Sequence, residues 1–188
     1  MTPTGLEAAL ARFEPAGAEE EADLARLRRL AATADPWDRR QPLHVTASAL
    51  VLHPPTARVL LRWHERLGRW LHVGGHGDPG ESDPFGIARR EAVEETGLDD
   101  VTAWPDPARP ELIQVAVVDV PARAPEPAHQ HADIRYLMAT AAPERARPES
   151  PDAPVRWLDF DEALELVGSD NLAAALRRAR DALTPRPG

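Results

Sequence analysis

The distribution of hydrophobic and polar positions divides the chain into a helical start, a strand-rich middle and a helical end. Residues 19–34 place Leu24 and Leu27 at helical spacing behind an acidic run, which is favourable at a helix N-terminus. We therefore expect an N-terminal helix that packs one apolar stripe on the rest of the chain.

From residue 44 onward the apolar positions follow the alternation and β-branched enrichment typical of strands. The predicted strands are residues 44–53, 58–64, 69–75, 111–122, 131–142 and 153–160. The first two flank the turn sequence PPTA and predict a hairpin. Proline-rich stretches separate the later ones and predict stiff loops.

One helix interrupts these strands, at residues 83–96. Asp83 is a suitable N-cap, Pro84 fits the first helical position, and Gly97 fits the position just past the end. Both ends of this helix are therefore specified chemically.

The end of the chain, residues 161–183, predicts two helical pieces broken at Gly168, with N-cap candidates from Ser169 to Asn171. Strands, a helix, more strands and terminal helices predict an α+β fold, in which helices lie on both sides of a mixed sheet. We expect three parts: an N-terminal helical extension with its linker (1–42), a main domain (43–183) and a short tail (184–188).

Composition narrows the classes of function. The formal net charge of −9 disfavours sequence-independent nucleic-acid binding, so an anionic small molecule would need local arginines or bound cations. The absence of cysteine excludes disulfides, thiolate zinc sites and a cysteine nucleophile, and fits a reducing compartment. The sequence shows neither a signal peptide nor a membrane-spanning apolar run, so we expect a soluble, cytoplasmic protein.

The predicted helix 83–96 carries Glu91, Glu94 and Glu95, which share one face at spacings i, i+3 and i+4. Carboxylates with Cβ atoms about 5–6 Å apart repel one another on a bare helix. Magnesium prefers carboxylate and phosphate oxygens and would relieve this repulsion. The acidic face therefore predicts a magnesium site.

The preceding segment VGGHGDPGE (residues 73–81) complements this face. Its glycines allow close approach of the main chain, so that a carbonyl near Gly74 could complete the metal shell and amides could meet phosphate oxygens. Arg90, beside the acidic set, is a rigid bidentate partner for a carboxylate.

Residues 75–98 resemble the signature of the Nudix hydrolases, G-x5-E-x7-R-E-U-x-E-E-x-G-U, where U is aliphatic. The matching residues are Gly75, Glu81, Arg90, Glu91, Ala92, Glu94, Glu95, Gly97 and Leu98. Eight residues, rather than seven, separate Glu81 from Arg90. We place the extra residue in the turn at 82–84, which leaves the helical part in register but puts the role of Glu81 in doubt.

The resemblance implies an α/β/α sandwich that hydrolyses a nucleoside diphosphate linked to another moiety, with Mg²⁺ or Mn²⁺. It implies Glu91 and Glu95 as the first metal ligands, with Glu94 sharing the metal and Gly74 adding its carbonyl, and Arg90 as the residue that orients a glutamate. The general base stays open between Glu91 and an acidic residue outside the motif.

Substrate contacts are expected from two segments. The phosphate-side loop and the strand before it offer Trp70, Gly75, His76 and Glu81, with Trp70 as a stacking surface for a base. The proline-framed stretch 129–133 is predicted to precede a strand and to fold over the cleft, bringing His131 and Asp133 to the substrate. The remaining histidines in or beside strands are expected to be packing residues: His44, His53, His64 and His72.

Two alternatives share the fold. An isomerase acting on isopentenyl diphosphate relies on a cysteine, and this chain has none. A catalytically weak, nucleotide-binding regulatory module remains the alternative to the hydrolase. In either case the expected partner is a nucleotide or another small diphosphate, without nucleic acid or membrane, and a homodimer is possible.

Overall fold

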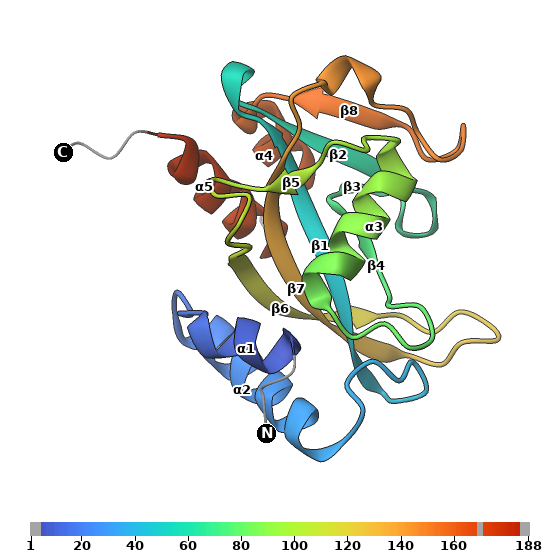
Figure 1. Cartoon of the computed structure of the whole chain (residues 1–188). Coiled ribbons are helices and arrows are strands. Elements are labelled where there is room, and N and C mark those ends of the chain that lie inside the picture. Colours follow the sequence, from blue (N-terminus) through green and yellow to red (C-terminus); the bar gives the residue numbers. More distant parts are fainter. Residues whose placement is uncertain (1–4, 169–170, 185–188) are drawn as a thin grey trace.

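The computed structural model describes residues 5–168 and 171–184 (Figure 1). Its centre is a mixed sheet, which has eight strands within these ranges. In this sheet β1 (Leu43–His53) runs parallel to β7 (His129–Ala139). The other pairings are antiparallel: β1 with β2 (Arg58–His64) and β4 (Val73–Gly75), and β7 with β6 (Leu112–Val120).

Shorter strands extend this sheet. The strands β3 (Arg69–Leu71) and β8 (Val155–Leu158) both pair with β2, and β5 (Thr102–Ala103) pairs with β7. The connections include 3-10 turns at Pro54–Thr56, Glu65–Leu67 and Pro143–Arg145.

Helices cover both faces of the sheet, as the sequence predicts. The helix α3 (Pro84–Thr96) lies across β1 and β4 on one face, and α4 (Phe160–Val167) and α5 (Asn171–Leu183) lie on the other (Figure 1). The α+β prediction of a mixed sheet between helices is therefore confirmed.

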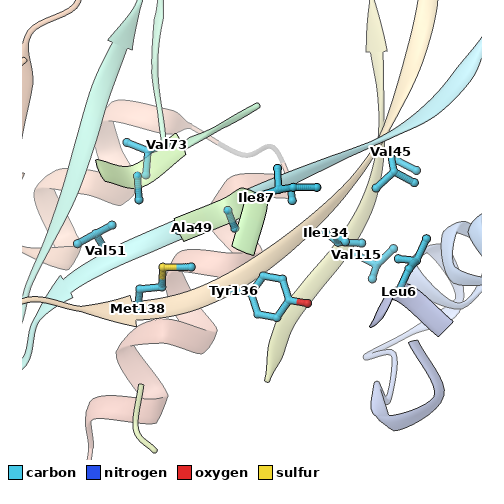
Figure 2. Close-up of a cluster of buried hydrophobic side chains, with 14 of the residues drawn as sticks. Leu6, Val45, Ala49, Val51, Val73, Ile87, Val115, Ile134, Tyr136 and Met138 are labelled. Atoms are coloured by element: carbon cyan, nitrogen blue, oxygen red, sulfur yellow. The ribbon is translucent and has the colours of Figure 1, made fainter. Parts of the chain in front are cut away.

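The alternation along β1 supplies both halves of the core. Val45, Ala47, Ala49 and Val51 belong to the cluster on the α3 side, which Figure 2 shows around Ile87 and Tyr136, whereas Leu50 and Leu52 belong to the cluster under α4 and α5. Because both faces are covered, β1 is buried along almost its whole length, including the polar residues His44, Thr46 and Ser48 on the face that carries Leu50 and Leu52.

The N-terminal helices α1 (Gly5–Arg12) and α2 (Ala18–Thr33) pack on the same core. Their leucines Leu6, Leu10, Leu24 and Leu27 are buried in the cluster that also contains Ile87. The predicted helix 19–34 is thus present as α2, while α1 was not predicted from the sequence. A domain division at residue 42 stays a prediction.

The structure corrects three local predictions. His72 separates the expected strand 69–75 into β3 and β4, and β5 is an additional short strand. The stretch 129–133 is not a loop before a strand, because β7 begins at His129 and pairs with β1 from Gln130 onward. The N-cap candidates Ser169 and Asp170, and the tail from residue 185, lie outside the described residues. Over the ranges described, every helix is too short or too polar to cross a bilayer.

Candidate active site at the acidic helix

The predicted caps position α3. Asp83 accepts a hydrogen bond from the Gly86 amide at 3.1 Å, Pro84 is the first helical residue, and Gly97 ends the helix in the left-handed conformation, with φ 68°. Ile87 and Ala92 are buried against the sheet. The acidic face, defined as Glu91, Glu94 and Glu95, lies beside these buried residues, with Glu91 and Glu95 directed toward β4. Glu91 and Glu95 are 16% and 12% exposed, whereas Glu94 is 54% exposed.

The strand β4 runs against this face and requires glycine twice. A Cβ on Gly75 would lie 2.8 Å from the carboxylate of Glu91. Gly74 has φ 149°, and a Cβ there would lie 2.5 Å from Cα of Ser48. The Gly74 amide donates to Glu95 Oε2 at 2.9 Å. The glycines thus let the main chain and the carboxylates meet directly.

Arg90 joins the phosphate-side loop to the acidic face. Its Nη1 donates to Glu91 at 3.0 Å and to Glu94 at 2.9 Å. Its Nη2 donates to the His76 carbonyl at 2.9 Å and to Glu81 at 3.0 Å. One guanidinium therefore fixes three carboxylates and the loop backbone, using its planar set of donors.

Burial makes ionisation of Glu91 and Glu95 on the acidic face unfavourable. Burial raises the pKa of Glu95 to about 7, although Arg62 lies 3.1 Å from its Oε1 and the Gly74 amide also binds it. Burial also raises the pKa of Glu91 despite its contact with Arg90. A cation at this position would stabilise both ionised carboxylates.

These residues fit a hard divalent cation. The donors are carboxylate oxygens held by arginines and a backbone amide, and the adjoining residues Gly74 and Gly75 also line a cavity. Glu91 and Glu95, with Glu94 at the exposed end, would hold the ion. The Gly74 carbonyl stays a predicted ligand.

Next to β4 lies a cavity of about 490 Å³. Its walls include Gly74, Gly75, His72, His76, His131 and Asp133, together with the arginines Arg66, Arg69 and Arg135. Acidic groups offset part of this positive charge: Arg135 pairs with Asp133, Arg66 pairs with Glu126, and Asp119 also lines the cavity. A second cavity of similar volume lies beside α1 and β6, lined by residues such as Phe13 and Pro110, away from Gly74 and Gly75.

Asp133 lies fully inside the wall of the first cavity. Its Oδ1 accepts from Thr46 at 3.1 Å and Ser48 at 2.6 Å, and its Oδ2 accepts from His72 at 2.9 Å and Arg135 at 2.7 Å. Burial opposes its ionisation, but Arg135 and His72 outweigh burial and hold the pKa of Asp133 far below its usual value. A carboxylate with four donors is an organising group rather than a free base.

Four histidines gather at the end of this cavity. His76 and His131 line it, and His44 and His129 adjoin them, with His44 Nε2 3.0 Å from His76 Nε2. Burial lowers the pKa of His76 to about 3 and that of His131 to about 4. His44 and His72, expected to be ordinary packing residues, thus adjoin or line the cavity.

The structure does not bring Trp70 to this cavity. Its ring packs edge-on against Trp63, with centroids 5.7 Å apart, and Arg156 lies over it at 5.5 Å. Trp70 is not among the residues that line the cavity, and its role as a base contact stays a prediction.

The sequence analysis did not assign three residues to the site: Arg62, His72 and Arg135. Alternation along β7 places Asp133 and Arg135 on the same face, which was the available signal for Arg135. The contact of Arg62 with Glu95 joins β2 to α3, and no local sequence pattern predicts it.

The class of protein that this fold and acidic helix define is a hydrolase. The chain belongs to the NUDIX family, since the family model described as the NUDIX domain matches residues 42–180. Comparison with curated proteins finds no significant match.

Solved structures support the fold. The Ap4A hydrolase of C. elegans has 18% identity and a TM-score of 0.56, covering 74% of this chain and 98% of that one. The dihydroneopterin triphosphate pyrophosphohydrolase of E. coli has 18% identity and a TM-score of 0.54, covering 73% and 94%. The NUDIX domain of Shewanella oneidensis NrtR, in complex with ADP ribose, has 20% identity and a TM-score of 0.52, covering 84% and 98%.

Proposed function

We propose that the protein hydrolyses a phosphoanhydride bond in a nucleoside diphosphate linked to another moiety, with Mg²⁺ or Mn²⁺ as cofactor. One observation carries the proposal. Burial raises the pKa of both Glu91 and Glu95 although arginines contact both carboxylates, and these carboxylates lie against Gly75 and Gly74, which also line the cavity. Nucleotides named with the similar structures, Ap4A and ADP ribose, contain such linkages.

In this proposal the residues of the acidic face and of the phosphate-side loop have different roles. Glu91, Glu95 and the more exposed Glu94 hold the cation, which when bound offsets phosphate charge and lowers the pKa of an attacking water. Arg90 fixes the glutamates and, through Glu81 and the His76 carbonyl, the loop beside the phosphates. Gly75 lets the diphosphate and the loop backbone approach the acidic face.

The wall opposite α3 positions the rest of the substrate. Arg69 lines the cavity together with Arg66, which pairs with Glu126, and the Asp133–Arg135 pair holds His72 in a fixed orientation. Nδ1 of His72 is buried without a hydrogen-bond partner among the described residues, so a substrate donor would reach it only after the side chain moved. Glu91 is the stronger candidate for general base, since the oxygens of Asp133 are already occupied.

Turnover of a nucleotide panel tests this function. ADP ribose, dinucleoside polyphosphates and nucleoside triphosphates are incubated with Mg²⁺ or Mn²⁺, and the products locate the cleaved bond. Glu95→Gln should abolish most turnover, and the matched variant Glu165→Gln, at an exposed position of α4, should retain it. Full activity of Glu95→Gln would overturn the assignment.

The same assay separates the alternative of a regulatory module. Nucleotide binding by calorimetry without any turnover, with Mg²⁺ and Mn²⁺ present, would favour that reading. A homodimer and a cytoplasmic location stay predictions.

A further inference from the structure

The four clustered histidines come from three separate segments of the chain. His44 is the second residue of β1, His76 follows β4, and His129 and His131 lie at the start of β7. Parallel pairing puts His44 directly beside His131 in the sheet, and the two-residue repeat of a strand puts His129 on the same face as His131. The fold itself therefore assembles this group.

The side chains of the group converge. One ring nitrogen from each of His44, His129 and His131 lies within 4.8 Å of the other two. The Nε2 atoms of His129 and His131 are 3.1 Å apart, and those of His44 and His76 are 3.0 Å apart. In a tetrahedral zinc site with Zn–N of about 2.0–2.1 Å, ligand nitrogens lie about 3.4 Å from one another. The two Nε2–Nε2 distances are close to that spacing.

The outer contacts of two histidines match those of metal ligands. Nδ1 of His44 lies 2.9 Å from the Gln41 carbonyl, and Nδ1 of His129 lies 3.0 Å from the Pro127 carbonyl. A carbonyl can only accept, so each Nδ1 carries the proton and each Nε2 presents its lone pair to the cluster. Metal-bound histidines show this arrangement, in which the second nitrogen is anchored by a backbone carbonyl or carboxylate.

We propose that His44, His129 and His131, with His76 as a fourth ligand, bind one divalent transition metal ion, Zn²⁺ by preference. The site is chemically distinct from the acidic face. Four imidazole nitrogens suit zinc and its neighbours in the transition series, whereas magnesium requires oxygen ligands.

Such an ion would tie the start of β1 and the start of β7 to the loop that follows β4. The His76 carbonyl accepts a hydrogen bond from Arg90, which also binds Glu81. The zinc site would therefore hold the phosphate-side loop from the side opposite α3, as a positioning element and without a part in bond cleavage.

Zinc binding can be measured without any substrate. A tag-free chain is stripped with a chelator and titrated with Zn²⁺ by calorimetry, with the bound metal counted by elemental analysis. We expect one zinc per chain at micromolar or tighter affinity, and Co²⁺ should give the visible absorption of a four-coordinate site. His129→Gln should weaken zinc binding at least tenfold, because it removes a ligand.

Two controls separate this site from other sites. His53→Gln, whose Nδ1 contacts Thr56 outside the cluster, should bind zinc like the parent chain. Glu95→Gln should also keep its zinc even if it loses turnover, so failure of the hydrolase proposal would not be mistaken for failure of this one. Circular dichroism checks that His129→Gln is folded. No zinc binding by the parent chain, undiminished binding by folded His129→Gln, or loss of zinc in Glu95→Gln would each overturn the proposal.

Discussion

Arg90 donates to Glu81 through Nε at 3.2 Å and Nη2 at 3.0 Å, across eight intervening residues. The helix α3 is continuous from Pro84 to Thr96, so the extra residue relative to the family spacing does not interrupt the helical register from Arg90 onward. The Asp78 amide donates to the same carboxylate at 2.8 Å and holds Glu81 within reach of Arg90. The insertion therefore leaves the link between loop and helix in place.

Arg90→Lys should reduce kcat/KM by about 10–100-fold, the usual cost of losing a group that orients metal ligands. A lysine ammonium cannot reproduce the planar set of contacts to Glu81, Glu91 and the loop carbonyl. Steady-state kinetics at saturating Mg²⁺ measure the effect. Arg89→Lys is the matched control, because Arg89 binds the carbonyls of Asp99 and Val101 away from the acidic face. Equal losses in the two variants would contradict the role of Arg90.

Gly75→Ala should lower kcat/KM by roughly 100-fold, the order expected when a reacting group is displaced by about 1 Å. The new methyl group would lie 2.8 Å from the Glu91 carboxylate and push it out of place. Gly5→Ala, where the nearest atom is 3.4 Å away, should behave like the parent. Wild-type kinetics in a folded Gly75→Ala chain would show that Glu91 does not need its present position.

Magnesium should stabilise the chain through the acidic face. A ligand at 100 times its Kd adds about 2.7 kcal/mol to the free energy of unfolding, which for a chain of this size raises Tm by roughly 5–10 °C. Scanning fluorimetry at pH 8, after chelator treatment, should show this rise for the parent and for Glu165→Gln. In Glu95→Gln the rise should be much smaller. An equal rise in all three would place magnesium elsewhere.

The sequence predicted the parts of this molecule that depend on local chemistry. Residues that are close together in the sequence determine the caps of α3, the spacing of its glutamates and the alternation of β1. The site beyond α3 depends on pairings between distant segments. The parallel register of β1 with β7 brings His44 to His131 and Ser48 to Asp133, and no local pattern specifies which strands become neighbours.

The same reason explains the corrected stretch 129–133. Proline-rich flanks and several polar residues are typical of a loop, and they favoured that interpretation. In the structure His131 and Asp133 line the cavity, His129 and His131 belong to the histidine cluster, and Gln130 on the other face of the strand binds Asp119. Local propensity failed here because tertiary contacts satisfied the polar groups.

The N-terminal helices should depend on one ion pair. Glu20 lies 2.8 Å from Arg178 of α5 and also accepts from the Ala16 and Val115 amides. Burial opposes ionisation of Glu20, but these donors together hold its pKa below the ordinary 4.5. Glu20→Gln should cost about 1.5–3 kcal/mol at pH 7, the value of a hydrogen bond to a charged group.

The pH dependence of this cost follows from the lowered pKa. The folded state prefers the ionised form, so the stabilisation is complete above pH 4.5 and disappears as the pH falls through the native pKa. Urea unfolding of the parent and Glu20→Gln should therefore converge in acid and differ at pH 7. The exposed neighbour Glu19, changed to Gln, should follow the parent at both pH values. A constant difference between parent and Glu20→Gln across the range would contradict the ion-pair account.

The central claim is that the acidic face holds a divalent cation against a diphosphate. Crystals grown with Mn²⁺ and a non-hydrolysable ADP ribose analogue test it most directly, through the anomalous scattering of manganese. The account predicts manganese within coordination distance of the carboxylates of Glu91 and Glu95, bridging to the diphosphate oxygens. Manganese bound only at other positions, with the analogue in place and both glutamates paired to arginine alone, would contradict it.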